Sequence, residues 1–373
     1  MLFDYEFRNF NYRLFLYVLL LNILGVLVIR SATNQDMTVV GKQIMGIVVG
    51  MAIVIGLSLI DYHRILSFSP VIYILCFCGL AAVLVFGRNV GGATRWLVLP
   101  FIGQIQPSEF VKIGLIIFFS WFFSKNQEKL NQVKTLAAAA GLFAVLVLLI
   151  LDQPDLSTSL VTVVVFICIL FVAGLSYRWI AGGLAVLIPC GALFIYLLQY
   201  NMVPFLKDYQ ARRILAFVNK AKFAEANLQQ DNSIMAIGSG MLSGKGLNNN
   251  TLASVKNGNF LSEEQTDFIF AVIGEELGFI GCTLVILMIA LVVYELLGMA
   301  ARAKDMSGRL ICVGLAALIA FQSFSNIAVA TGVFPNTGLP LPFISYGVSS
   351  LISIYLGIGV ALNVGLQKKN SNH

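Results

Sequence analysis

The chain has 373 residues, of which 58% are hydrophobic and only 11% are charged, and its formal net charge is +6. Soluble globular domains carry about 25% charged residues, so this composition, with a mean hydropathy of +0.88, excludes a soluble protein and predicts an integral membrane protein. All six cysteines lie within apolar segments and only two histidines occur, which argues against a disulfide framework and a histidine-based metal centre.

Ten apolar stretches approach the roughly 20 residues that a membrane span requires. We therefore expect an all-α membrane protein of about ten transmembrane helices, organised as one polytopic domain over residues 1–373, with a long extracytoplasmic loop, 201–266, between helices seven and eight. Only DQPD separates the fifth span from the sixth, which predicts a tight hairpin. The predicted spans are 14–30, 44–60, 70–86, 110–124, 135–151, 156–174, 179–200, 271–298, 309–332 and 349–366.

The distribution of basic residues predicts the orientation of these spans. If the N-terminus and the connections after even-numbered spans are cytoplasmic, those segments hold twelve of the 24 Lys and Arg residues. The positive-inside rule then places both termini in the cytoplasm. The net charge therefore reflects orientation, and we expect no nucleic-acid partner. The outer connections are rich in Gly, Pro, Gln and Ser, which favours chemistry on the outer face.

Several segments on the outer side hold candidate functional residues, and the first two are short. In QPSEFVK, Pro107 suits the first position of a helix, and Glu109 and Lys112 are three residues apart, so they share a helix face. Two interpretations of Glu109 and Lys112 remain open. They form a local ion pair at the start of a helix, or Lys112 carries a charge into the membrane for a functional reason. In DQPDLSTS, Asp155 suits the N-cap of the sixth span.

The long loop contains Arg212 and Arg213 and then a glycine-rich stretch, AIGSGMLSGKG, around Lys245. Paired arginines suit phosphate, and glycines let backbone amides approach an anion. The stretch is no nucleotide P-loop, because Gly246 follows Lys245 where Ser or Thr is required. Taken alone, both segments are also compatible with an ordinary solvated loop.

EEQTDFIFAVIGEELG places Asp267, Glu275 and Glu276 at or inside the eighth span without a basic residue in the segment. Thr266 or Asp267 could cap this helix. Alternatively, Asp267 at the outer mouth of the span meets a substrate. Glu275 lies about 12 Å further along the axis, too far to form a dyad with Asp267, so we expect both glutamates to serve as packing or hydrogen-bond partners within the bundle.

The chain contains seven motifs in the same order as the SEDS family (shape, elongation, division and sporulation), and through them it resembles the RodA, FtsW and SpoVE proteins of that family. The resemblance covers nearly the whole chain, and the short termini and DYQARR favour a RodA-type protein. The chain departs from the family pattern at Gln265, Met241 and Val348. The motifs are GGATRW (91–96), QPSEFVK (106–112), QPDLSTS (153–159), YQARR (209–213), AIGSGMLSGKG (236–246), TDFIFAVIGEELG (266–278) and PLPFISYGVSS (340–350).

The resemblance implies a peptidoglycan glycosyltransferase of the bacterial cytoplasmic membrane. Such enzymes join lipid II units into glycan strands at the outer face, and they work with a class B penicillin-binding protein transpeptidase and other elongation or division membrane proteins. The essential acidic residue of the family corresponds to Asp267. The expected substrate-binding residues are Arg95, Glu109, Lys112, Arg212, Arg213 and Lys245.

We expect an inverting displacement in which Asp267 is the general base for the sugar hydroxyl. The basic residues just named would stabilise the leaving pyrophosphate, with or without a divalent cation such as Mg²⁺ or Mn²⁺. Two other classes remain open. A lipid II transporter would also place charges in the membrane, but reachable from both sides, and a division scaffold without catalysis would not need Asp267. The sequence does not separate elongation, division and sporulation roles.

Overall fold

The computed structural model describes residues 9–90, 93–99, 103–199, 215, 224–248 and 264–367, and statements about its contacts concern these residues. It is helical almost throughout. The helices are α1 (Tyr12–Ala32), α2 (Met37–Ser58), α3 (Tyr62–Ser67), α4 (Ser69–Phe86), α5 (Pro107–Lys125), the short 3₁₀ helix η2 (Gln127–Lys129), α6 (Val133–Asp152), α7 (Leu156–Val172), α8 (Tyr177–Gln199), α10 (Ala224–Ser239), α11 (Ile269–Ala301), α12 (Met306–Ala330) and α13 (Val348–Leu366).

Eight of these helices are long and apolar enough to cross a membrane, and α7 and the apolar part of α8 are shorter. The chain is therefore a multi-pass membrane protein, as predicted. Each of the ten predicted ranges overlaps one of these helices. Because two of them fall short of a full span, the number ten stays a prediction.

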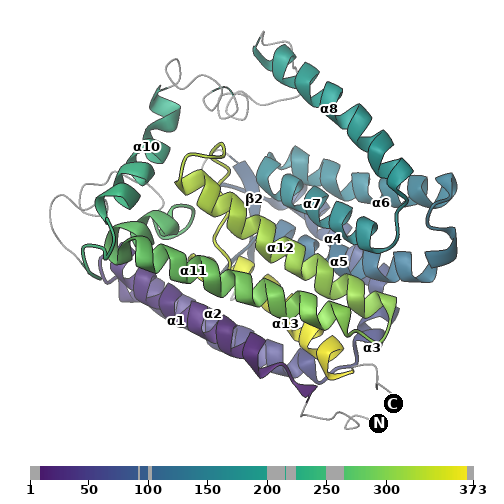
Figure 1. The fold of residues 1–373 in the computed structure, drawn as a ribbon, viewed down its shortest axis with the longest axis horizontal. Helices are drawn as coiled ribbons and strands as arrows, with labels where there is room; N and C mark the ends of the chain where they lie inside the picture. The colour runs from purple at the N-terminus through teal and green to yellow at the C-terminus, as the bar shows by residue number, and fades with distance from the viewer. Residues whose placement is uncertain are drawn as a thin grey trace.

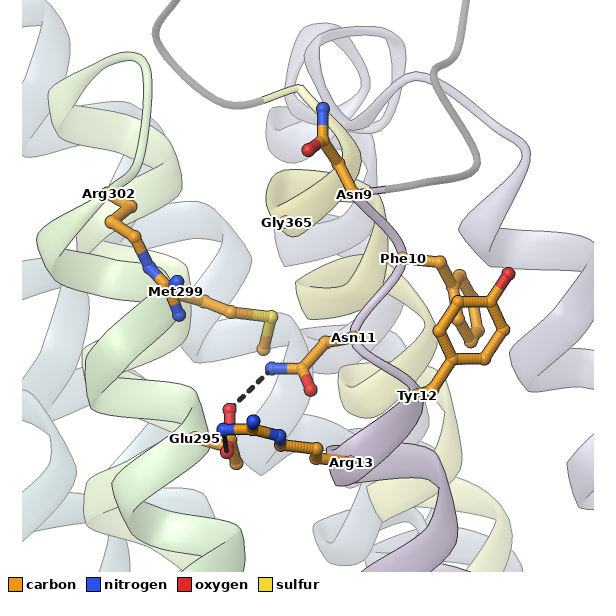
Figure 2. A pocket seen from close by; sticks show the side chains of 9 residues that line it. All are labelled: Asn9, Phe10, Asn11, Tyr12, Arg13, Glu295, Met299, Arg302 and Gly365. Carbon is orange, nitrogen blue, oxygen red and sulfur yellow. Dashed lines mark hydrogen bonds and ion pairs between the residues drawn. The ribbon is translucent and has the colours of Figure 1, made fainter. Parts of the chain in front are cut away.

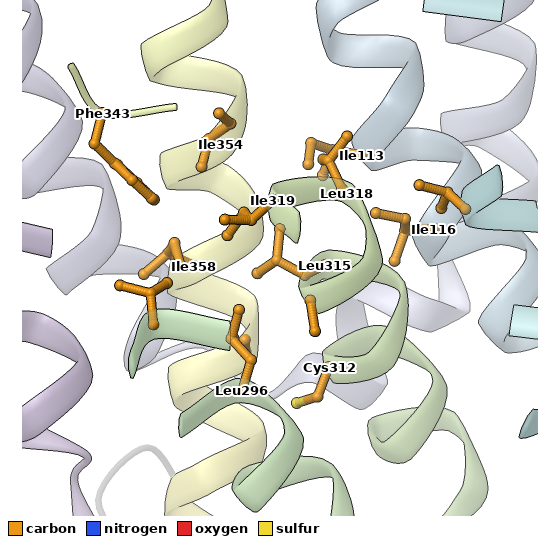
Figure 3. Close-up of a cluster of buried hydrophobic side chains, with 14 of the residues drawn as sticks. Ile113, Ile116, Leu296, Cys312, Leu315, Leu318, Ile319, Phe343, Ile354 and Ile358 are labelled. Atoms are coloured by element: carbon orange, nitrogen blue, oxygen red, sulfur yellow. The ribbon is translucent and has the colours of Figure 1, made fainter. Parts of the chain in front are cut away.

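The helices form a bundle with two distinct ends (Figure 1). α10 lies at one end, and α3, the start of α1 and the end of α13 lie at the other; we call these the α10 end and the α3 end. The central helices are α5, α12 and α13. Buried residues make up 72%, 67% and 78% of their apolar spans, respectively, but only 17% of the span of the peripheral helix α4. Buried aliphatic side chains fill the space between them, including Ile113, Leu315 and Ile358 (Figure 3).

A three-stranded antiparallel sheet joins α4 to α5 and was not predicted. It consists of β1 (Arg88–Val90), β2 (Ala93–Leu99) and β3 (Gly103–Ile105). β2 pairs with both neighbours, and its sequence ATRWLVL has the β-branched and aromatic residues that favour strands. Two strands of three residues give too short a pattern to recognise among the glycines of this connection.

α10 lies within the segment 201–266 that we predicted as a loop. Its buried face is polar, which hides it from a search for apolar periodicity. Gln230 Nε2 donates 2.8 Å bonds to the carbonyls of Val329 and Phe334, and Ser233 Oγ donates to the Ala330 carbonyl at 2.8 Å. Carbonyls at a helix C-terminus lack intrahelical partners, so α10 docks by satisfying the last turn of α12.

A cluster of polar side chains joins α3 to the start of α12 at the α3 end. Asp305 caps α12 through the Gly308 amide at 2.8 Å and accepts a 2.8 Å bond from the Tyr62 hydroxyl. His63 bridges the carboxylates of Asp61 and Asp305 at 2.9 and 3.1 Å. Burial tends to raise the pKa of Asp305, but the hydrogen bonds that its carboxylate accepts outweigh this, and the pKa lies below the ordinary value.

Candidate active site

Asp267 lies in a turn that precedes α11 at the α10 end, and its side chain is half-buried. α11 begins at Ile269, and Phe268 occupies its N-cap position, so Asp267 lies two residues before the helix, and capping by Thr266 or Asp267 stays a prediction. The Asp267 carboxylate lies against Gly338, where an added Cβ would come within 3.0 Å of Oδ2. The Asp267 backbone carbonyl accepts a 2.8 Å hydrogen bond from Asn326 Nδ2.

Two amide side chains of α12 hold the loop 331–347 in place beside Asp267. Asn326 Nδ2 also donates to the Leu339 carbonyl at 2.7 Å, and Gln322 Nε2 donates to the Pro340 carbonyl at 3.0 Å. Gln322 and Asn326 are four residues apart, so they project from one face of the helix. Both are fully buried, and together they fix the backbone that flanks the Asp267 carboxylate.

Further hydrogen bonds tie the end of this loop to the turn that contains Asp267. Ser345 Oγ donates to the Thr266 carbonyl at 2.6 Å, and the Tyr346 amide donates to the Gln265 carbonyl at 2.8 Å. Phe343 has φ of 66° although its side chain is buried. A bulky residue adopts this left-handed conformation only where its surroundings impose it, so the loop and the turn form one rigid unit.

Arg95, on β2, packs against the N-terminus of α7. Its Nε donates to the Gln153 carbonyl at 3.3 Å, its Nη2 donates to the Pro154 carbonyl, and its Nη1 lies 3.8 Å from Asp155 Oδ1. Asp155 is also the predicted N-cap of α7, since its Oδ1 accepts from the Thr158 amide at 3.1 Å. The DQPD hairpin between α6 and α7 is therefore confirmed, and it anchors Arg95.

One contact links the surroundings of Arg95 to those of Asp267. Ser157 Oγ, in the first turn of α7, donates to the Thr337 carbonyl. Thr337 directly precedes Gly338, which touches the Asp267 carboxylate. The sheet, α7, the loop 331–347 and the turn before α11 thus meet in one region at the α10 end, although they are far apart in the sequence.

Glu109 and Lys112 form the ion pair that their spacing indicated. α5 begins at Pro107, as predicted, and Lys112 Nζ donates to Glu109 Oε1 at 2.9 Å and to Gln322 Oε1 at 2.8 Å. The Lys112 side chain is 0% exposed. Lys112 therefore orients Gln322, whose amide holds the Pro340 carbonyl, and the substrate-binding role that we expected for both charged residues stays a prediction.

Lys245 pairs with a glutamate of α11 across 30 positions of sequence. Its Nζ donates to Glu275 Oε1 at 2.7 Å, and its backbone amide donates to the Glu275 carbonyl at 2.9 Å. This second bond is made where α11 kinks at Gly278 (φ 66°). Glu276 accepts a hydrogen bond from Ser31 of α1. Both glutamates are buried, as expected for partners within the bundle.

Some of the expected site residues are not brought together by the described contacts. Arg212 and Arg213 lie outside the described residues, so their place at the site stays a prediction. Conversely, the sequence analysis did not single out Gln322 or Asn326. The signal for both was present, because a Gln and an Asn four residues apart interrupt an otherwise apolar span.

A divalent cation was a candidate cofactor. Among the described residues, no group of three or more His, Cys, Asp or Glu side chains could hold a metal ion. Mg²⁺, however, is commonly bound by one or two carboxylates together with the phosphates of a substrate. Asp267 and a pyrophosphate would meet that description, so metal dependence remains a prediction.

Comparison with known proteins gives one consistent result. The family model of FtsW, RodA and SpoVE, described as cell cycle proteins, matches residues 12–370. The chain is 34% identical to a probable peptidoglycan glycosyltransferase FtsW of Geobacter metallireducens, over 98% of this chain and 97% of that protein. It is also 34% identical to the peptidoglycan glycosyltransferase MrdB of Escherichia coli K12, over 95% and 93% of the two chains.

Solved structures agree with the fold. A chain from a peptidoglycan synthase complex, studied for how it coordinates polymerization and crosslinking, superposes with a TM-score of 0.79 at 28% identity and covers 95% of this chain and 97% of that one. The rod shape determining protein RodA of Thermus thermophilus gives a TM-score of 0.69 at 28% identity, with 97% of each chain covered.

Proposed function

The chain belongs to the FtsW, RodA and SpoVE family and is a peptidoglycan glycosyltransferase, and from this premise we propose that Asp267 is its general base. One observation carries the assignment. Asp267 is a half-buried carboxylate outside any helix, and the turn that presents it meets the loop 331–347, α7 and the sheet in one region. An enzyme gains rate by holding a reacting group in a fixed orientation, and the bonds from Asn326 and Ser345 supply that rigidity.

The reaction assigned to this site joins two lipid-linked sugars. The 4-hydroxyl oxygen of the acceptor, lipid II, attacks the anomeric carbon of the donor glycan. The bond from that carbon to the lipid-linked pyrophosphate breaks, and the pyrophosphate leaves with the electron pair. Asp267 takes the hydroxyl proton, which typically accelerates such a transfer by about 10²–10⁴-fold. Attack opposite the leaving group inverts the anomeric configuration.

The leaving pyrophosphate requires positive charge. We assign this role to Arg95, whose side chain is 22% exposed, and to Lys245, whose side chain is 25% exposed, together with Arg212 and Arg213 of the long loop. Lys112 is sealed within the bundle, so we propose that it acts through Gln322 on the loop beside Asp267.

We further propose that the α10 end faces the outside of the bacterial cytoplasmic membrane. The charge distribution supports this, since the connections at the α3 end are rich in Lys and Arg. A class B penicillin-binding protein transpeptidase is the proposed partner. A structural relative at 28% identity belongs to a complex described as coordinating polymerization and crosslinking, which supports such a pairing.

The test is polymerisation of labelled lipid II by purified protein, with its partner present, comparing the wild type with Asp267→Asn. Asp231→Asn is the matched control, because Asp231 is an exposed carboxylate on α10 that the proposal leaves out of the chemistry. We expect glycan strands from the wild type and the control and none from a well-folded Asp267→Asn variant.

Two other outcomes would change the assignment. Strands from Asp267→Asn at the wild-type rate would remove this residue from the chemistry. If neither protein made strands in the presence of the partner, transport of lipid II or scaffolding would become the better explanation of the site.

A further inference from the structure

A cavity of about 430 Å³ lies at the α3 end, opposite to the proposed active site. Figure 2 shows that it is formed where the start of α1 meets the last turns of α11 and α13. Its lining is mixed: Phe10 and Met299 are apolar, whereas Asn11, Arg13, Glu295 and Arg302 are polar or charged. The proposed polymerase reaction uses none of these residues.

Glu295 forms the fixed floor of this cavity. It is only 7% exposed, and its Oε2 accepts a 2.9 Å hydrogen bond from Asn11 Nδ2. Arg13 Nη1 lies 4.0 Å from Glu295 Oε1, at the limit of an ion pair, and the Arg13 side chain is 80% exposed. The carboxylate therefore holds the start of α1 against α11 while the Arg13 guanidinium stays at the opening.

Arg302 supplies a second guanidinium on the other side of the cavity. Its Nε donates to the Gly298 carbonyl at 2.9 Å, which fixes the side chain along the end of α11. A guanidinium has five N–H donors, so both arginines keep donors for a ligand. Two cations and one carboxylate leave the lining one positive charge in excess, which suits a singly charged anion.

Two of the three helices that form the cavity, α1 and α11, are long and apolar enough to cross a membrane, and the cavity lies at one end of both. α1 and α11 each present a stripe of exposed apolar side chains along the same spans, directly beyond the charged lining. These residues are Leu16, Leu20, Ile23 and Leu27 on α1 and Leu284, Leu287, Leu291 and Leu297 on α11. A ligand with a phosphate at one end and hydrocarbon chains at the other matches both parts.

We propose that this cavity binds the phosphate of an anionic phospholipid headgroup. Guanidinium groups form bidentate hydrogen bonds with phosphate, and basic pockets between membrane helices are suited to acidic headgroups. The lipid would join the start of α1 to the end of α11, the helix whose other end follows Asp267. The inner leaflet follows from the orientation proposed above, but the binding itself does not depend on it.

The test is native mass spectrometry of detergent-purified protein titrated with dioleoyl phosphatidylglycerol. The pocket variant is Arg13→Gln/Arg302→Gln. Its matched control is Arg64→Gln/Arg309→Gln, which removes the same charge from exposed positions at the same end. We expect the pocket variant to bind the lipid at least about tenfold more weakly, from the loss of charge-assisted hydrogen bonds, and the control to match the wild type. The variant Arg13→Lys/Arg302→Lys should recover part of the affinity.

Retained polymerisation of lipid II and a monodisperse size-exclusion profile show that the pocket variant is folded. Equal binding by the wild type and the pocket variant would overturn the proposal, as would an equal loss in the control, which would indicate general surface charge. Dioleoyl phosphatidylcholine binding as tightly as phosphatidylglycerol would overturn the preference for an acidic headgroup. If inorganic phosphate displaced the lipid at equal concentration, the occupant would be a soluble phosphate and the lipid assignment would be wrong.

Discussion

Replacing Asn326 by leucine should slow polymerisation about 10²-fold, because its amide holds the backbone on both sides of the Asp267 carboxylate. Leucine has the same branching and the same number of side-chain heavy atoms but no donor. The Leu339 carbonyl is buried, so losing its donor costs about 1–3 kcal/mol. The Asp267 carbonyl is only partly buried, and water recovers some of its loss, so the total should be about 2–4 kcal/mol. Misplacing a reacting group by about 1 Å can cost about 10²-fold in rate.

The assay measures kcat and KM for lipid II polymerisation together with thermal unfolding in detergent. We expect kcat to fall while KM changes little, because the loop positions the base and not the lipid. Ser325→Ala is the control: Ser325 directly precedes Asn326 in α12, and its buried hydroxyl has no hydrogen-bond partner among the described residues. A folded Asn326→Leu variant with the wild-type kcat would refute the reasoning, and so would an equal loss in Ser325→Ala.

Lys112→Met should cost about 3–5 kcal/mol, since it leaves the Glu109 carboxylate buried without its cation, and the double variant Lys112→Met/Glu109→Gln should recover most of that loss in thermal unfolding. Lys245 is tested by comparing the thermal stability and the polymerisation rate of Lys245→Met with those of Lys245→Met/Glu275→Gln. If the double variant regains stability but not polymerisation, Lys245 acts on the substrate. If it regains both, the ion pair between Lys245 and Glu275 is structural. The lowered pKa of Asp305 means that its stabilising effect is present above about pH 4 and is lost as pH falls through that pKa. Melting curves from pH 3 to 7 should show this loss in the wild type and a weaker dependence in Asp305→Asn.

The sequence was sufficient for the elements that follow one simple rule. Apolar runs of membrane length located the spans, and the Pro107 and Asp155 signals located the starts of α5 and α7. Where the rule does not apply, the prediction was wrong or incomplete. α10 buries a polar face, so it has no apolar stripe to detect, and the strands beside Arg95 are too short to show alternation.

The contacts of the site also divide into those that the sequence predicted and those that it could not predict. Glu109 and Lys112 are neighbours on one helix, so their spacing predicted the ion pair. Lys245 and Glu275 are joined only by the fold, because a kink in α11 brings the glycine-rich stretch against it. A single sequence contains no local signal for a pair separated by 30 positions, and the glutamates of this span therefore looked unneutralised.

The polar residues buried near Asp267 have a common physical cause. Irregular backbone at membrane depth is tolerated only where protein groups satisfy its amides and carbonyls. The loop 331–347 has an irregular backbone between two candidate spans, and its Pro340 and Leu339 carbonyls are satisfied by Gln322 and Asn326. In the proposed assignment Asp267 is the base, and it lies on a non-helical turn whose backbone these amides hold. The amides and hydroxyls inside the otherwise apolar spans then serve to fix that turn, and this is why we expect Asn326→Leu to impair the reaction through the position of Asp267.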